Sequence, residues 1–279
     1  MRDNLVRAIC VGALALSLAA CNEQDTAATE QTFGHSPTLP APESSLIPTI
    51  NIATATGWPA GGKPLAAKGM AVNAFATGLD HPRTLLVLPN GDVLVAETNA
   101  PPRPDDEKGI KGWVTKMVVS RAGAGTPSAN RITLLRDADG DGVTETRSVF
   151  LEGLNSPFGM ALVGDDFYVA NTDAIMKFPY HAGDIKITAP GVKLVDLPAG
   201  ALNHHWTKDL IASRDGSKLY ATVGSNSNVG ENGIEVEADR ASVLEIDRAT
   251  GKRRVFACGP QATAASDPSW NHQPRQVAP

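Results

Sequence analysis

The stretch Thr84–Ala96 reads TLLVLPNGDVLVA, two runs of β-forming residues on either side of Asn90-Gly91. An Asn-Gly pair between such runs is a strong hairpin signal, because both residues accept the positive φ values that the tightest hairpin turns need. A second pair of runs, 159–163 and 167–171, flanks a turn at 164–166. The chain therefore predicts antiparallel strands joined by short turns.

The hairpin pattern recurs along the chain. Comparable units start near residues 78, 153 and 201, and a further hairpin surrounds the turn at 249–252. The step from 153 to 201 matches the roughly 40–50 residue period of propeller blades. The predicted fold class is therefore all-β, an incomplete β-propeller of about three to four blades. The hairpin at 241–255 would belong to a partial fourth blade.

An insertion accounts for the longer first step. Residues 101–128 begin with a proline-rich, charged segment and continue into Ile110–Arg121. Val114, Met117 and Val118 recur there at helical spacing. We therefore predict one short helix on a surface excursion between two strands.

The N-terminus reads as a targeting segment. Arg2 and Arg7 precede an apolar run, 8–20, that is too short to span a bilayer. It ends in Leu18-Ala19-Ala20-Cys21, the form of a bacterial lipobox, so we expect residues 1–20 to be a lipoprotein signal peptide and Cys21 to carry lipid. An ordinary secretory signal is the alternative. The lipobox predicts a periplasmic protein anchored to the bacterial membrane, and Asn22 in place of Asp favours the outer membrane.

The remaining chain divides by composition. Residues 21–66 are rich in Thr, Ala, Pro and Ser without apolar periodicity, which predicts a disordered tether. Residues 67–256 form the predicted partial propeller, and 257–279 form a divergent tail. After processing only Cys258 would remain as a free thiol, so no internal disulfide is expected. The net charge of −5, without a basic stripe, predicts no nucleic-acid partner.

A cluster of acidic residues predicts a calcium site. Asp137, Asp139 and Asp141 alternate with small residues and are followed by Gly142, a pattern in which a tight loop wraps Ca²⁺ with carboxylate oxygens. Glu145 is a further candidate ligand. A complete helix-loop-helix calcium hand is not predicted, because Ser148 stands at the twelfth position. A turn with solvated charges is the alternative.

Polar residues follow several predicted strands at the same place in each unit. Glu97 and Asn99 follow the first hairpin, Asn171 and Asp173 follow the second, and Asn226 follows the third. Their recurrence predicts that they line one funnel over a ligand. Capping of the loops by Asn and Asp is the alternative explanation.

His205 is the candidate with the clearest chemistry. It stands in His204-His205-Trp206-Thr207-Lys208, before a strand and the turn Gly224-Ser225. An imidazole with a pKa near neutrality suits a general base. A histidine that only makes hydrogen bonds within its loop is the alternative.

This segment resembles the catalytic-histidine blade of the pyrroloquinoline quinone (PQQ) dependent sugar dehydrogenases, in particular the sorbosone and soluble aldose (glucose) dehydrogenase family. The family pattern is His-Trp-Thr-Arg, with Lys208 here in the last position. The resemblance extends over residues 72–256. It implies a six-bladed propeller, PQQ and Ca²⁺ as cofactors, a sugar or sugar aldehyde as substrate, and a quinone or cytochrome as electron acceptor.

The resemblance also implies roles for individual residues. His205 would remove the proton of the sugar hydroxyl. Lys208 would face a carboxylate of PQQ, and the strand-end residues would contact the cofactor; these are Glu97, Asn99, Asn171 and Asn226.

The chain departs from the family pattern after residue 256. The family continues with Gly-Leu-Arg-Asn-Pro, whose Arg and Asn contact the quinone, whereas this chain reads ACGPQAT at 257–263. We hypothesise a frameshift near codon 258, and we expect weak or absent dehydrogenase activity from the 279-residue product.

Two further functions remain open at this point. A calcium-dependent propeller lactonase would hold its ion with Glu97, Asn171 and Asp173 and use water as the nucleophile. A non-enzymatic binding propeller of the cell envelope would use His205 only for packing.

Overall fold

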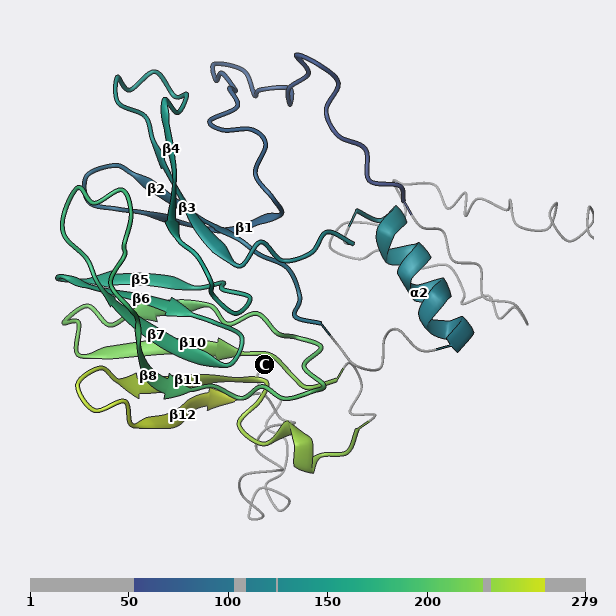
Figure 1. Cartoon of the computed structure of the whole chain (residues 1–279), viewed down its shortest axis with the longest axis vertical. Helices are drawn as coiled ribbons and strands as arrows, with labels where there is room; N and C mark the ends of the chain where they lie inside the picture. Colours follow the sequence, from purple (N-terminus) through teal and green to yellow (C-terminus); the bar gives the residue numbers. More distant parts are fainter. Residues whose placement is uncertain (1–52, 103–108, 124, 228–231, 259–279) are drawn as a thin grey trace, which may run out of the picture. The chain divides into compact units, whose positions relative to one another are not determined.

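The computed structural model describes residues 53–102, 109–123, 125–227 and 232–258 (Figure 1). Its contacts separate residues 1–53 from residues 54–279, and every element below belongs to the second unit. Residues 53–66 contain neither helix nor strand. The predicted signal peptide, Cys21, most of the predicted tether and the tail from residue 259 lie outside the described residues. Within the described parts, no helix is both long and apolar enough to cross a membrane.

The described chain is nearly all β and forms three four-stranded antiparallel sheets. The first contains β1 (Pro82–Val87), β2 (Val93–Glu97), β3 (Arg131–Arg136) and β4 (Thr146–Leu151). The second contains β5 (Met160–Val163), β6 (Asp166–Ala170), β7 (Ala174–Pro179) and β8 (Val192–Asp196). The third contains β9 (Leu210–Ala212), β10 (Lys218–Val223), β11 (Ser242–Asp247) and β12 (Arg253–Cys258). The strands of each sheet are neighbours in chain order, as in the blades of an incomplete propeller-like fold.

The prediction that the hairpin at 241–255 belongs to a partial fourth blade was wrong. β11 pairs with β10 over its whole length, from Lys218↔Asp247 to Val223↔Ser242. The hairpin 241–255 is therefore the outer half of the third sheet. A long connection, which includes the 3₁₀ helix η2 (Glu235–Glu237), separates β10 from β11 and hid this pairing from the sequence pattern.

The predicted helix in the insertion is confirmed as α2 (Gly109–Arg121). The insertion does not interrupt the sheet around it. β3 pairs with β2 in continuous register from Val93↔Leu135 to Glu97↔Arg131, as if the two strands were joined by a short turn. A surface excursion of this kind is tolerated because closing a longer loop adds little entropic cost.

Apolar side chains join each sheet to the next. Leu94, Ile132 and Phe150 of the first sheet pack with Phe167 of the second, and the rings of Phe150 and Phe167 meet edge to face at 5.5 Å. Tyr168 and Ile175 on the second sheet pack with residues of the third, which are Leu219, Leu244 and Ile246. The first strands are also neighbours, since β1 contacts β5 and β5 contacts β9. The sheets therefore stack in sequence around their first strands.

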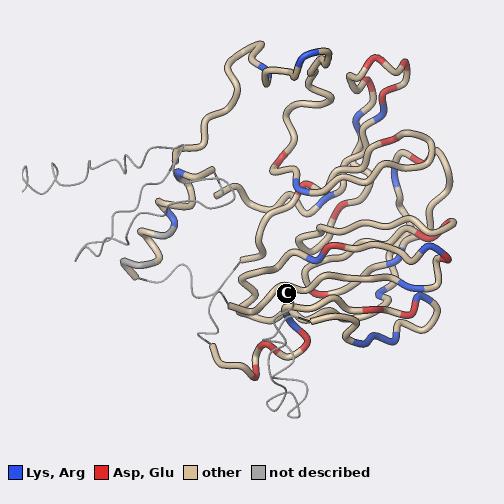
Figure 2. Tube along the Cα trace, turned by 180° about the vertical axis from the view of Figure 1, so that it is seen from behind, with Lys and Arg blue, Asp and Glu red and all other residues tan. Residues whose placement is uncertain are grey.

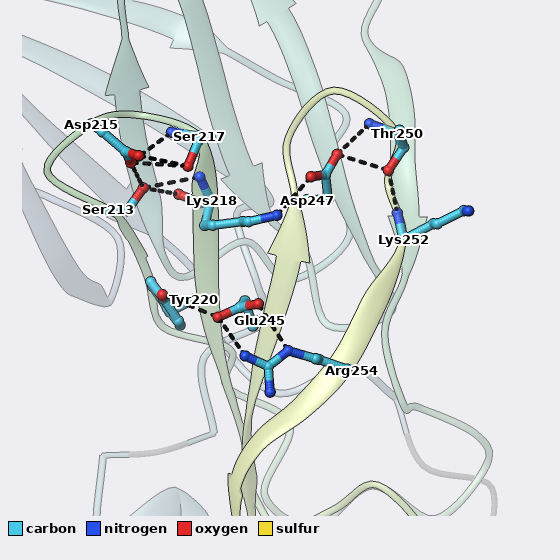
Figure 3. Close-up of polar contacts among 10 residues, drawn as sticks. All are labelled: Ser213, Asp215, Ser217, Lys218, Tyr220, Glu245, Asp247, Thr250, Lys252 and Arg254. Atoms are coloured by element: carbon cyan, nitrogen blue, oxygen red, sulfur yellow. Dashed lines mark hydrogen bonds and ion pairs between the residues drawn. The ribbon is translucent and has the colours of Figure 1, made fainter.

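The face of the third sheet that points away from this core carries paired charges. Strand alternation places Lys218, Tyr220, Glu245 and Asp247 opposite the buried residues of β10 and β11. Lys218 and Asp247 form an ion pair of 2.7 Å, and Arg254 donates two hydrogen bonds to Glu245 (Figure 3). The bonds from Arg254 hold the pKa of the Glu245 carboxyl below its usual value. This face is thus adapted to a polar environment.

Gly159 marks a close backbone approach between the second and third sheets. Its N–H donates to the carbonyl oxygen of Lys208 at 2.9 Å. A Cβ at this position would lie 2.3 Å from the backbone nitrogen of Leu210, so a side chain would force the two sheets apart.

We predict that Gly159→Ala lowers the free energy of unfolding by about 1–3 kcal/mol, because the added methyl overpacks a rigid backbone contact. Urea unfolding measures the change. Gly57→Ala is the matched control, since a Cβ at Gly57 meets nothing within 4 Å. Equal stabilities of the two variants would contradict the predicted contact.

A buried carboxylate anchors the turn between β1 and β2. Asp92 is 2 % exposed and receives two hydrogen bonds from the guanidinium of Arg136, at 2.6 and 2.7 Å. These bonds hold the pKa of Asp92 below its ordinary value of 3.8. Its stabilising contribution is therefore present above the unfolded-state pKa and is lost as the pH falls through the lower folded-state pKa.

We predict that Arg136→Met costs about 1–3 kcal/mol of stability at pH 7, because the Asp92 carboxylate stays buried without its fork of donors. The loss should shrink near pH 3, where Asp92 of the variant takes up a proton. Urea unfolding at both pH values tests this. Lys193→Met, which breaks the exposed pair with Asp196, should cost less than about 1 kcal/mol at pH 7.

Candidate functional site

The candidate site lies where the first strand of each sheet begins and the second strand ends. A backbone hydrogen bond joins the loop before the first strand to the loop after the second strand in each sheet. Thr98 N–H donates to His81 O at 3.2 Å, and Thr172 N–H donates to Asn155 O at 3.0 Å. In the third sheet His204 N–H donates to Asn226 O at 3.2 Å. The repeated sequence unit therefore brings the same two loops together in each sheet, although the direction of the bond in the third sheet is reversed.

His205 is exposed, and one of its ring nitrogens is anchored. Nδ1 lies 3.1 Å from the carbonyl oxygen of Ser225 and 2.9 Å from its hydroxyl oxygen. The Ser225 hydroxyl donates its own proton to the carbonyl of Ser227 at 2.8 Å. Both Ser225 oxygens therefore act as acceptors toward Nδ1, which must carry the proton in the neutral ring. This tautomer leaves the lone pair on Nε2.

Gly224 makes room for this histidine. A Cβ on Gly224 would lie 2.3 Å from the Cβ of His205. The residue that follows β10 therefore has to be glycine for the imidazole to reach Ser225. The Gly-Ser turn that the sequence pattern singled out has a steric role here.

An aromatic shelf lies in the same loops. The rings of Phe158 and Trp206 meet edge to face at 6.2 Å, and the guanidinium of Arg83 lies within 6 Å of both ring centres. Arg83 is exposed, whereas Trp206 is buried. These residues precede or begin the first strands of the three sheets, so an exposed cation of the first sheet lies beside the half-buried ring of Phe158 and the buried ring of Trp206.

Lys208 is in the interior of the protein. Its side chain is 0 % exposed, and Nζ donates to the carbonyl of Trp206 at 3.3 Å. Burial and the neighbouring Arg240 lower its pKa to about 8. The predicted contact between Lys208 and a cofactor carboxylate therefore does not fit this position. The amine instead donates a hydrogen bond to the loop that carries His205.

A buried polar network that the sequence analysis missed continues from this lysine. Asn203 donates to the hydroxyl of Thr172 at 2.9 Å, and that hydroxyl donates to the carbonyl of Trp206 at 3.1 Å. Arg240 donates to Asn203 Oδ1 at 2.9 Å. The sequence contained a signal for this network, because a residue with a hydroxyl group follows the second strand of each sheet. These residues are Thr98, Thr172 and Ser225.

Thr172 and Asn203 also line a small cavity. Its volume is about 240 Å³, and its lining includes Asn155, Asp173 and residues 199–201. Asp173 is exposed. Of the predicted strand-end residues, only Asp173 lines this cavity.

The carboxylate of Glu97 is fully hydrogen-bonded within the first sheet and the loop before it. It is 0 % exposed and receives two hydrogen bonds from Arg131, at 2.9 and 3.0 Å, together with bonds from the Thr133 hydroxyl and the Asp80 N–H. Burial raises the pKa of Glu97, but these donors outweigh it and lower the pKa overall. The arrangement is that of a structural ion pair.

The side chains of Asn99 and Asn226 make hydrogen bonds to neighbouring loops. Asn99 donates to the carbonyl of Thr126, and its backbone N–H donates to Ser128. Asn226 donates through its side chain to the carbonyl of Leu202 at 2.5 Å and through its backbone to Glu237 at 2.7 Å. The fifth predicted cofactor contact, Asn171, lines a different cavity. The predicted cofactor contacts are therefore not brought together around His205.

The predicted metal ligands do meet. Carboxylate oxygens of Asp137, Asp139, Asp141 and Glu145 all lie within 4.8 Å of one another, at the tip of the β3–β4 hairpin, where Figure 2 shows acidic residues gathered. Carboxylates at this spacing can hold a hard divalent cation such as Ca²⁺. Glu97 pairs with Arg131 at one end of the first sheet, and Arg136 pairs with Thr146 at the other end. The acidic tip follows Arg136, so it lies at the end of this sheet that is away from the His205 loop.

Comparisons with known proteins describe what the chain is similar to. No curated protein matches it. Solved structures with similar folds include the PQQ domain of a pyranose dehydrogenase from Coprinopsis cinerea, with 16 % identity, a TM-score of 0.45, and coverage of 65 % of this chain and 39 % of that one.

Two further similar structures differ in their described activities. An aldose sugar dehydrogenase from Streptomyces coelicolor with bound PQQ has 17 % identity, a TM-score of 0.39, and coverage of 69 % and 48 %. A putative 6-phosphogluconolactonase from Bacteroides uniformis has 14 % identity, a TM-score of 0.32, and coverage of 65 % and 40 %. The chain thus spans less than half the length of each of these structures.

One family model matches the sequence itself. It is described as "Domain of unknown function (DUF7133)" and matches residues 105–261, which is more than half of the chain. The match runs from the helical insertion through β3 to β12 and includes both His205 and the acidic hairpin tip. The chain therefore belongs to the family of this domain of unknown function, DUF7133.

Proposed function

We propose that this chain carries the base-bearing part of a propeller that oxidises a sugar hydroxyl or aldehyde with a quinone cofactor of the PQQ class. The observation that supports the proposal is the fixed tautomer of His205. Both Ser225 oxygens accept at Nδ1, and Nε2 is left as a proton acceptor on an exposed ring.

The chemistry assigned to this chain is removal of a proton. Oxidation of a sugar hydroxyl breaks its O–H bond and the C–H bond on the same carbon, and the carbon loses two electrons. His205 Nε2 would take the hydroxyl proton, and the resulting imidazolium would be stabilised by its Nδ1–H bonds to Ser225. A bound quinone supplies the acceptor for the hydride.

The residues present fit such a cofactor in part. Arg83 offers an exposed cation beside the histidine loop, next to the half-buried ring of Phe158 and the buried ring of Trp206. PQQ carries several carboxylates, and the buried positions of Lys208 and Arg240 do not present further charge to a ligand. We therefore propose weak cofactor binding and slow turnover for this chain.

The lactonase alternative receives less support. Its three candidate ligands point to different places: Glu97 to Arg131, Asn171 to one cavity and Asp173 to another. Among the described residues, the acidic group that could hold a metal is the hairpin tip, at the other end of the first sheet. We propose that this tip binds Ca²⁺ as a structural ion.

We also propose the location inferred from the sequence. The lipobox ending in Cys21 would anchor the protein in the periplasm, with the outer membrane preferred. Electrons would then pass to a membrane quinone or a small cytochrome.

We predict that the purified chain, supplied with PQQ and Ca²⁺, reduces a dye acceptor slowly with aldoses. His205→Ala should lower this rate at least about 100-fold, because a positioned base contributes roughly 10²–10⁴. His204→Ala is the matched control and should stay within about twofold. The proposed activity would be contradicted if equilibrium dialysis showed no PQQ binding and the assay showed no turnover.

The tautomer provides a second readout of the same proposal. Nitrogen-15 NMR of the apo protein with a neutral His205 ring should show the proton on Nδ1 and the lone pair on Nε2. Ser225→Ala should weaken this preference while leaving the fold intact. A proton on Nε2 in the unmodified protein would remove the proposed base.

We predict that Ca²⁺ stabilises the chain by mass action, by about 2.7 kcal/mol at a concentration 100-fold above Kd. The double variant Asp137→Asn/Asp141→Asn should lose this gain, because two carboxylate ligands lose their charge. Asp165→Asn, at an exposed turn, is the control. Thermal unfolding with Ca²⁺ and with EDTA measures the effect, and an equal gain in both variants would refute the site.

A further inference from the structure

Helix α2 (Gly109–Arg121) forms without support from the sheets. Within the described parts of the chain, it packs closely on none of the strands. β2 and β3 pair in continuous register, so the insertion at 98–130 adds nothing to the pairing of the first sheet. Helices of this length are marginal in water unless an apolar face packs against another surface. The described residues therefore do not supply the surface that such a helix needs.

One side of α2 carries an exposed apolar stripe of three residues. Trp113 is 66 % exposed, Met117 is 50 % exposed and Val114 is 40 % exposed. Met117 follows Trp113 by four residues and Val114 by three, so the three side chains lie on the same side of the helix. A contiguous exposed apolar surface of this kind is typical of a site that contacts a partner or a membrane.

The residues next to this stripe are basic. Lys116 lies about one turn from Trp113, and Arg121 lies about one turn from Met117. The sequence of α2 contains no Asp or Glu, and the acidic residues at 105–107, which precede the helix, lie outside the described residues. The charge beside the stripe is therefore positive, and it complements an anionic surface.

The segment that is bound to the end of α2 also exposes apolar side chains. Ala55 N–H donates to the carbonyl of Arg121 at 3.1 Å, so residue 55 is fixed beside the last turn. Trp58 follows Ala55 within about 11 Å of chain, and both Trp58 and Leu65 are exposed. Lysine is depleted in protein–protein interfaces, whereas helices that lie on membranes combine tryptophan with lysine and arginine. The composition therefore favours a lipid surface over a protein partner.

We propose that α2 lies on the surface of a membrane that contains anionic lipids. Its apolar stripe enters the boundary between headgroups and acyl chains, and Lys116 and Arg121 reach the lipid phosphates. The helix lies along the membrane rather than across it, since it is too short to span the hydrocarbon layer. The proposal rests neither on the dehydrogenase function nor on the lipid proposed for Cys21.

The test measures binding of the full chain, produced without lipid on Cys21, to vesicles of phosphatidylcholine mixed with phosphatidylglycerol. Met117→Glu should weaken binding at least about tenfold, because a methionine that enters the lipid is replaced by a charge that the anionic lipids repel. Val192→Glu is the matched control, since it makes the same charge change at an exposed strand residue and should bind within about twofold of the unmodified protein. The apolar segment 8–20 is present in every variant, so the differences report on α2.

The charge and the depth of the helix provide two further readouts. Lys116→Gln/Arg121→Gln should weaken binding to the mixed vesicles by about fivefold for each charge removed, and much less on phosphatidylcholine alone. Brominated acyl chains should quench part of the tryptophan fluorescence, and a smaller part in Trp113→Phe. Equal binding of Met117→Glu and Val192→Glu, or equal quenching with and without Trp113, would overturn the proposal and leave a protein partner to cover the stripe.

Discussion

Burial of apolar side chains between successive sheets is the constraint on which the rest of the structure depends. An isolated four-stranded sheet would leave both of its faces in water, so each sheet needs a neighbour. The second sheet has one on each side, and four of the five residues of β6 are buried. The third sheet has one covered face, whereas on the first sheet Val95, Glu97 and Thr133 are buried on the face that points away from the second sheet. Ionic pairs lie on the faces that point away from the second sheet: the buried Glu97 with Arg131 on β2 and β3, and the partly exposed Lys218 with Asp247 on β10 and β11.

Short-range features of the fold were predictable because they are encoded locally. The Asn-Gly turn after β1 and the helical spacing in α2 each lie within a few residues of the structure that they specify. The pairing of β11 with β10 was not predictable in this way, since the loop with η2 separates the partners. The sequence shows a hairpin at 241–255, but only tertiary packing of Leu244 and Ile246 against the second sheet assigns that hairpin to the third unit.

The same distinction explains the outcome for the site. A strand points successive side chains to opposite faces, so neighbours along the chain can have unrelated surroundings. Asn171 lines a cavity beside the first sheet, whereas the adjacent Thr172 bonds to the loop of His205. Recurrence of polar residues after each strand led the sequence analysis to the end of the sheets where the His205 loop lies. It could not tell which residue of each pair faces which neighbour.

The interior position of Lys208 also has a physical explanation. The carbonyl of Trp206 accepts hydrogen bonds from the Lys208 amine and from the Thr172 hydroxyl, one from the third unit and one from the second. The peptide next to His205 is therefore fixed from two sheets at once. A buried amine with a pKa of about 8 costs free energy at neutral pH. The hydrogen bond from the Lys208 amine to the Trp206 carbonyl offsets part of that cost and helps to fix the loop that carries His205.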